Sequence, residues 1–202
     1  MIRRSAGFTL LEVLITLIIL AVGMLGLANL QSKIHVTEIE SYQRAQAVLL
    51  LQDMADRINS NRSTDALAGY VSATELGTLT DEDCDDATIA AITPATRRMA
   101  ANDRCQWSDA LLGASETRTS GGVTSNVGAM IGARGCIEQV QAPNDAIGVC
   151  TPGIYRVTVA WQGLHSTKIP ALGCGAGDYG NDAQRRVIAM EITIGLPRCA
   201  SP

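Results

Sequence analysis

The first thirty residues constrain this chain more than any other part of it. From Phe8 to Leu30 the sequence reads FTLLEVLITLIILAVGMLGLANL, with Glu12 as its only charged residue. A helix of this length rises about 35 Å at ~1.5 Å per residue, more than the roughly 30 Å hydrocarbon core of a bilayer. Arg3 and Arg4 precede the run, and basic residues stay on the cytoplasmic side of a membrane. We therefore predict one transmembrane helix, with the remainder of the chain in the periplasm or beyond.

Glu12 distinguishes this segment from simpler apolar helices. A charge at membrane depth costs roughly 2.5–3.5 kcal/mol on insertion scales, so we expect it to have a partner or a purpose. A cleaved signal peptide is one alternative, because Gly26-Leu27-Ala28 offers a small-x-small cleavage site. A plain membrane anchor is the second, and a buried helix of a soluble core is the third. The length of the run argues against the signal peptide, the charge of Glu12 argues against both membrane alternatives, and the basic start MIRR argues against the soluble core.

Composition excludes several classes of function. The chain of 202 residues is 47% hydrophobic, which argues against disorder throughout. It has only seven aromatic residues and a net charge of −4, so we expect no nucleic-acid partner. Gly175–Gly180 matches G-x-G-x-x-G but lacks the flanking strand and helix of a nucleotide site. Asp81, Asp83 and Asp85 lack the glycine and glutamate of a calcium loop, and Arg97-Arg98 is interpreted as a surface charge pair.

The sequence motifs do not indicate an enzyme. No G-x-S-x-G elbow or other nucleophile setting is present, and His35 and His165 stand alone in the sequence. We therefore predict no catalytic residues, no cofactor and no metal site.

The apolar helix is expected to continue well past the membrane. The chain has no proline before Pro94, and Ala47, Leu51, Met54 and Ile58 recur at the spacing of one helix face. One helix of about 50 residues, ending near residues 59–61, fits this pattern. Its first half is the predicted membrane helix, and its second half is expected to carry a globular head, with a coiled-coil stalk as the alternative for that half.

The head is expected to be rich in β-structure. Ile154–Gln162 and Arg186–Leu196 alternate apolar and polar residues as half-buried strands do, and Cys136–Gln141 is a candidate third strand. Gly113–Asn126 is predicted to be a loop or a hairpin tip. Together these elements indicate an α+β fold, a long helix with an antiparallel sheet.

Six cysteines are expected to form three disulfides. None has C-x-x-C spacing, so neither a zinc site nor a redox centre is indicated. A head on the oxidising side of the membrane favours disulfides. Fifteen connectivities are possible for six cysteines. We predict the sequential one, which closes short local loops: Cys84–Cys105, Cys136–Cys150 and Cys174–Cys199.

The segment Gly7-Phe8-Thr9-Leu10-Leu11-Glu12, after a basic leader and before an apolar helix, resembles the type IV prepilin motif. The resemblance implies that prepilin peptidase cleaves after Gly7 and methylates the new amine of Phe8. It implies that Glu12 docks the N-terminal amine of a neighbouring subunit. The mature net charge would be −6, because Arg3 and Arg4 leave with the leader. The implied organisation is a leader (1–7), an assembly helix (8–30), an amphipathic helix (31–62) and a disulfide-stabilised β-rich head (63–202).

Within that family the chain is most similar to minor pilins, through Glu12–Leu27 and through Tyr155–Gly163. Three disulfides and a proline-free helix depart from the pattern of major pilins. The resemblance implies an inner-membrane protein that is later assembled into the fimbrium, primes pilus assembly, and serves twitching motility and adhesion. Its implied partners are prepilin peptidase, other minor pilins, the major pilin and a PilY-type adhesin. A type II secretion pseudopilin is the alternative, and a tethered periplasmic enzyme or binding domain is the second.

Overall fold

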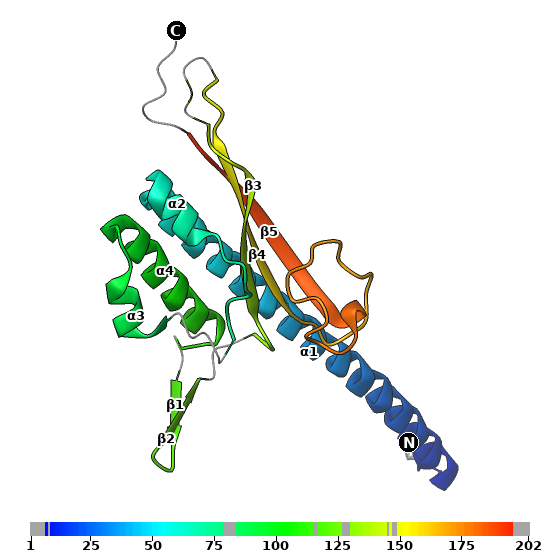
Figure 1. The fold of residues 1–202 in the computed structure, drawn as a ribbon. Coiled ribbons are helices and arrows are strands. Elements are labelled where there is room, and N and C mark those ends of the chain that lie inside the picture. The colour runs from blue at the N-terminus through cyan, green and yellow to red at the C-terminus, as the bar shows by residue number, and fades with distance from the viewer. Residues whose placement is uncertain are drawn as a thin grey trace, which may run out of the picture. The chain divides into compact units, whose positions relative to one another are not determined.

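The computed structural model describes residues 7, 9–78, 84–114, 117–126, 130–144, 146 and 149–195 (Figure 1). It does not describe the side chains of residues 86 and 123–125. The chain divides into two units, residues 1–42 and residues 43–202. One continuous helix, α1 (Leu10–Ser60), belongs to both of them. This is the single long helix that the sequence predicts.

The second half of α1 forms one side of the head's core. Ala47, Leu51, Met54 and Ile58 are all at most 1% exposed. They are the four residues whose spacing predicted a buried helix face. The polar side of the same stretch, including Arg44 and Asp56, is exposed. The hydrophobic effect therefore fixes which side of α1 the head covers.

A three-stranded antiparallel sheet forms the other side of this core. Its order is β3 (Arg134–Gln141), β4 (Gly153–Gln162) and β5 (Arg185–Ile194). Alternate residues of β4 enter the core cluster with α1, namely Tyr155, Val157, Val159 and Trp161. Met190 of β5 pairs with Val157, and Ile192 and Ile194 of the same strand are buried. The two strands predicted from alternation and the candidate third strand are confirmed, and the fold is α+β and pilin-like.

Three helices that follow α1 in the sequence and precede the strands were not predicted. They are α2 (Thr64–Tyr70), α3 (Asp86–Ala91) and α4 (Ala95–Leu111). Figure 1 shows α2 and α4 side by side. The side chain of Ser63 accepts a hydrogen bond from the Ala66 amide and so caps α2. Asp85 stands at the start of α3, whereas Asp81 and Asp83 lie outside the described residues.

The Gly113–Asn126 segment contains a hairpin, which was one of its two predicted forms. Strands β1 (Thr117–Ser120) and β2 (Val123–Asn126) pair antiparallel in a small sheet of their own. Gly121 and Gly122 form the turn, both with positive φ, which glycine adopts without steric cost.

The disulfide prediction is partly wrong. Cys84–Cys105 is present, as the sequence analysis expects. Cys136 bonds Cys174 rather than Cys150, so the predicted pairs Cys136–Cys150 and Cys174–Cys199 do not form. Cys150 is itself disulfide-bonded, and Cys199 lies outside the described residues.

The fold explains the correction. Cys136 pairs with Thr158 in the sheet and lies on the face opposite α1, because its neighbour Ile137 points into the core. The segment 163–184 follows β4 and brings the Cys174 sulfur to within 3.9 Å of the Thr158 carbonyl oxygen. The two Cα atoms are then 5.9 Å apart, within the normal range for a disulfide. The sequential pairing was predicted from the number of residues between cysteines. That number does not show that Cys174 approaches Cys136 across the sheet.

A buried arginine holds the same segment in place. Arg185 is 2% exposed and donates hydrogen bonds to the carbonyl oxygens of Leu172, Cys174 and Pro170. The Tyr179 hydroxyl donates to the Gly132 carbonyl oxygen at 2.8 Å. The Gly175–Gly180 motif, which lies in this segment, therefore forms packed turns.

Breaking Cys136–Cys174 should release the segment 163–184 from the sheet. We expect the Cys136→Ser, Cys174→Ser double variant to lose about 2–4 kcal/mol of stability, because the unfolded chain is no longer cross-linked. Lys168, exposed in this segment, should then become a fast site for trypsin. Limited digestion followed by mass spectrometry measures the rate of cleavage after Lys168. In the matched Cys84→Ser, Cys105→Ser control, this cleavage should stay as slow as in the parent. Equal cleavage rates in both variants would contradict the assignment.

Candidate assembly site on the N-terminal helix

The candidate site lies in the first turn of α1. Thr9 precedes the helix, and its hydroxyl accepts a hydrogen bond from the Glu12 amide at 3.3 Å. The Thr9 carbonyl oxygen accepts from the amides of Glu12 and Val13. Thr9 and Glu12 thus have the spacing of a capping box, the threonine at the cap and the glutamate three residues later. The carboxylate also lies where the helix dipole favours negative charge.

The surroundings of Glu12 are apolar. Leu10, Leu11 and Val13 are 88%, 67% and 49% exposed, so the carboxylate lies on an uncovered hydrocarbon surface. Within the part of the chain that the structure describes, its side chain has neither a hydrogen-bond partner nor an ion-pair partner. Surrounded by lipid, an unpaired carboxylate is costly. This arrangement can bind a cationic group from another molecule.

The apolar surface extends far along α1. The helix is long and apolar enough to cross a membrane, and its most apolar stretch is not covered by any described part of the chain. Gly23 and Gly26 face open space, so a neighbouring helix could approach closely there.

Comparison with known families agrees with this geometry. Residues 2–28 match the family model described as the prokaryotic N-terminal methylation motif. The chain carries a prepilin-type motif. The match supports a type IV pilin-like protein, either a pilin or a pseudopilin, and implies processing by prepilin peptidase and pilin assembly. No curated protein and no solved structure matches the chain.

The predicted site residues differ in what the structure says of them. Gly7 is exposed, with no heavy atom within 4 Å of the position a Cβ would take. Phe8 lies outside the described residues. Cleavage after Gly7, methylation of Phe8 and docking at Glu12 stay predictions. Thr9 was missed as the residue that positions Glu12, although the T-x-x-E spacing in the sequence could have identified it.

A second polar cluster, in the head, serves packing. Arg57 of α1 contacts Asp53 at 3.0 Å and Asp103 of α4 at 3.1 Å. The Tyr70 hydroxyl of α2 donates to the same Asp103 carboxylate. Burial is the main cause that raises the pKa of Tyr70 above its ordinary value, and the hydrogen bond to Asp103 raises it further. The cluster therefore ties α1, α2 and α4 together through charge-assisted hydrogen bonds.

One group of side chains in the described residues has the proximity that a metal site needs, namely Glu75 with Cys136 and Cys174. The two sulfur atoms are bonded to each other. Neither is therefore a thiolate, which is the form that binds a metal. The Glu75 carboxylate instead accepts a hydrogen bond from the Gly175 amide at 2.7 Å.

Proposed function

We propose that this chain is a minor pilin of the type IV pilus, most like PilV. The observation that carries the proposal is the methylation motif at residues 2–28, placed at the start of a 51-residue helix that ends in a disulfide-bonded head. Prepilin peptidase cleaves after Gly7 and methylates Phe8. The helix then stays in the inner membrane, with the head in the periplasm, until the subunit enters the filament.

Glu12 supplies the assembly contact. Its carboxylate accepts the N-terminal amine of a neighbouring subunit, and each charge lowers the desolvation cost of the other. The apolar surfaces of the helices then bundle around the pair. The mechanism is association without chemical catalysis, and the partners are chains that carry a carboxylate at the same depth.

Features of the head support the minor role. Several cysteine cross-links and the segment Tyr155–Gly163, which resembles minor pilins, favour a specialised subunit over a bulk filament protein. Such a subunit joins other minor pilins and the major pilin to prime assembly, and presents its head near the tip with a PilY-type adhesin. Twitching motility and adhesion depend on that complex. A type II secretion pseudopilin is the second candidate, because the same motif serves both assemblies.

Deletion of the gene tests the proposal against the second candidate. We expect surface pili and twitching to fall at least about tenfold, while the major pilin accumulates normally in the membrane. Electron microscopy and immunoblots of sheared fractions measure this, with the reintroduced gene as control. Normal pili together with loss of a secreted enzyme would overturn the pilus assignment in favour of a secretion pseudopilus.

A further inference from the structure

Strand β5 forms one edge of the sheet in the head. The sheet has two edge strands, β3 and β5, because β4 lies between them. Figure 1 shows β5 on the side of the sheet away from α2 and α4. It pairs with β4 along all 10 of its residues, from Arg185 to Ile194, without a shift of register. Among the described residues, no further strand and no isolated bridge pairs with its other side.

Half of the main-chain groups of β5 point away from β4. The Gly163 amide donates to the Gln184 carbonyl oxygen at 2.8 Å, just beyond the paired residues of β4 and β5. Hydrogen-bonded and non-hydrogen-bonded pairs alternate along an antiparallel ladder. The amides and carbonyls of four β5 residues are therefore directed outward: Val187, Ala189, Glu191 and Thr193. No loop in the described part of the chain forms a main-chain hydrogen bond with them.

The other edge of the sheet, on β3, is covered by the chain itself. Leu76 pairs with Gly135 of β3 through two main-chain hydrogen bonds, of 2.8 and 2.9 Å. The Ser72 amide donates to the Ile137 carbonyl oxygen of the same strand at 3.2 Å. The register of β3 also shifts near its C-terminal end. A covering segment and an irregular register both protect an edge strand from pairing with other chains.

Strand β5 lacks these protections between Val187 and Thr193, a stretch that the structure describes completely. The stretch contains neither proline nor lysine. Its one charged residue, Glu191, contacts Arg156 of β4 at 2.8 Å. A long edge without such features is a template for pairing with another chain. The two edges of this sheet therefore differ, and only the edge on β5 is prepared to accept a strand.

A groove of about 480 Å³ lies between this edge and α1. Its walls are residues 190–193 of β5 and one flank of α1, next to the helix face that enters the core. The lining residues from α1 are Gln52, Ala55, Asp56 and Asn59. A strand added to β5 would lie about 4.8 Å from it, so its side chains on one face would enter this groove.

The charge of the groove favours a basic side chain. Asp56 is exposed, and among the described residues its carboxylate has neither an ion pair nor a hydrogen bond. Glu191, the other acid of the lining, is paired with Arg156. None of the eight described lining residues is basic. A lysine or arginine from an added strand would therefore pair with the Asp56 carboxylate.

We propose that β5 accepts an extended segment of a partner protein as a fourth strand, with a lysine or arginine of that segment facing Asp56. In this mode of recognition, main-chain hydrogen bonds supply affinity and alternate side chains supply specificity. On the face toward α1, polar side chains of the segment would meet Gln52 and Asn59. On the other face, aliphatic side chains would lie beside Val187 and Ala189, because side chains on one face of paired strands are neighbours.

The experiment measures binding of short peptides to the full chain in non-ionic detergent micelles. Saturation-transfer NMR gives the affinity, with empty micelles as the reference. The lysine peptide is acetyl-Thr-Val-Lys-Val-Thr-amide, and the glutamine peptide has glutamine in place of its lysine. Two further probes are the lysine peptide N-methylated at both valines or at the lysine. Only one of these sets of amides can face β5. We therefore expect one methylated peptide to bind at least about tenfold more weakly and the other to bind like the lysine peptide.

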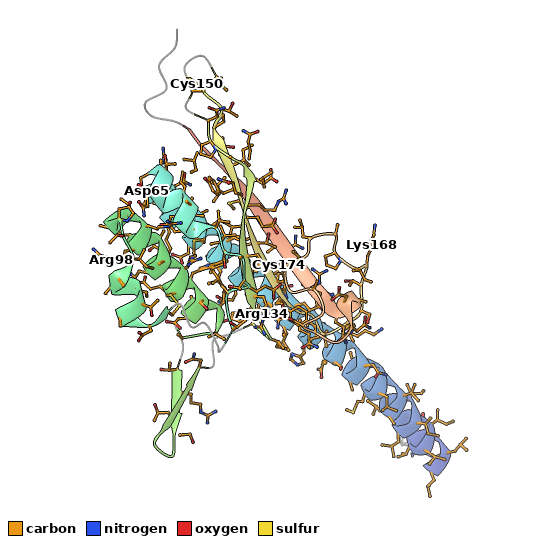
Figure 2. All side chains as sticks on the ribbon, viewed as in Figure 1. Asp65, Arg98, Arg134, Cys150, Lys168 and Cys174 are labelled. Carbon is orange, nitrogen blue, oxygen red and sulfur yellow. A yellow bond between two sulfur atoms is a disulfide. The ribbon has the colours of Figure 1, made fainter. Side chains whose placement is uncertain are left out.

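Ala189→Pro and Asp56→Asn test the two parts of the site. Proline at position 189 removes an outward amide and leaves the ladder to β4 intact, as proline does on natural edge strands. It should weaken binding of the lysine peptide at least about tenfold. In the parent the lysine peptide should bind about two- to fivefold more tightly than the glutamine peptide, the range of an exposed ion pair, and Asp56→Asn should abolish this preference. Asp65→Asn removes the same charge from α2, away from the groove (Figure 2), and should change neither affinity.

Three results would overturn the proposal: no binding of the lysine peptide, equal binding of the two methylated peptides, or equal effects of Asp56→Asn and Asp65→Asn on the lysine preference. Should Ala189→Pro fail to fold, the methylated peptides and Asp56→Asn carry the test. A peptide of residues 117–126, the hairpin of β1 and β2, tests another occupant. Tighter binding of that peptide than of the lysine peptide would overturn the choice of a foreign partner in favour of a second copy of this chain. The assay uses the purified chain, so its outcome is independent of the minor-pilin proposal.

Discussion

Replacement of Glu12 by alanine is expected to remove the chain from sheared surface filaments, to below about a tenth of the parent level, while cleavage after Gly7 proceeds normally. The carboxylate lies on an uncovered apolar surface, without a partner among the described residues. In the proposed filament its partner is a neighbour's amine, and a buried amine that loses its counter-charge is strongly destabilised. The membrane pool of processed protein should rise correspondingly.

Immunoblots of sheared and membrane fractions measure the distribution, and mass spectrometry of the N-terminal peptide reports processing. Glu38→Ala is the matched control, because Glu38 is an exposed acid on the same helix that contacts His35 at 3.2 Å outside the apolar segment. It should leave incorporation unchanged. Incorporation of Glu12→Ala at the parent level would show that the carboxylate is not the docking group.

The second large effect is on stability, at Trp107. This side chain is fully buried, and its Nε1 donates to the Leu50 carbonyl oxygen of α1 at 2.9 Å. Its ring also lies over Gly135 of β3, where a Cβ atom would come within 2.2 Å of it. Trp107 thus joins α4, α1 and the sheet. We expect Trp107→Ala to cost about 3–5 kcal/mol, measured by urea unfolding of the full chain in detergent.

Two variants sharpen that prediction. Met99→Ala on the exposed side of α4 (57% exposed) should change stability by less than about 0.5 kcal/mol. Gly135→Ala should cost about 1–3 kcal/mol in the parent, since its methyl group would overlap the Trp107 ring. The same substitution in the Trp107→Ala background should cost much less. Additive effects of the two substitutions would contradict the proposed contact.

The elements that sequence reasoning found are those with strong local patterns. The four-three-four spacing of Ala47, Leu51, Met54 and Ile58 depends only on helix geometry, and all four are buried. Alternation along Ile154–Gln162 likewise depends only on the pleat of a strand. By contrast, α4 buries two alanines, a cysteine, a serine, one tryptophan and a single leucine, and not a stripe of large aliphatic residues. Its apolar pattern was too weak to predict a helix.

The two kinds of site differ in the same way. Gly7, Phe8 and Glu12 belong to one contiguous motif, which a sequence displays completely. The pairing of Cys136 with Cys174 depends on segment 163–184 crossing the sheet, and this is a property of the fold. Arg97 and Arg98 are equivalent in the sequence. Only the packing of α4 against α2 places Arg97, and not Arg98, in the lining of the pocket that these two helices share with residues 92 and 93.

The most direct test of the proposed function is the identity and location of the mature N-terminus. Surface filaments are sheared from cells, and the N-terminal peptide of this chain is identified by mass spectrometry in the sheared and membrane fractions. The minor-pilin proposal predicts N-methylated Phe8 in the sheared fraction, at low abundance beside a major pilin. Methylated Phe8 confined to the membrane would instead favour a pseudopilin or a primer retained at the base. An intact Met1, or a chain that begins at Asn29, would contradict the prepilin assignment altogether.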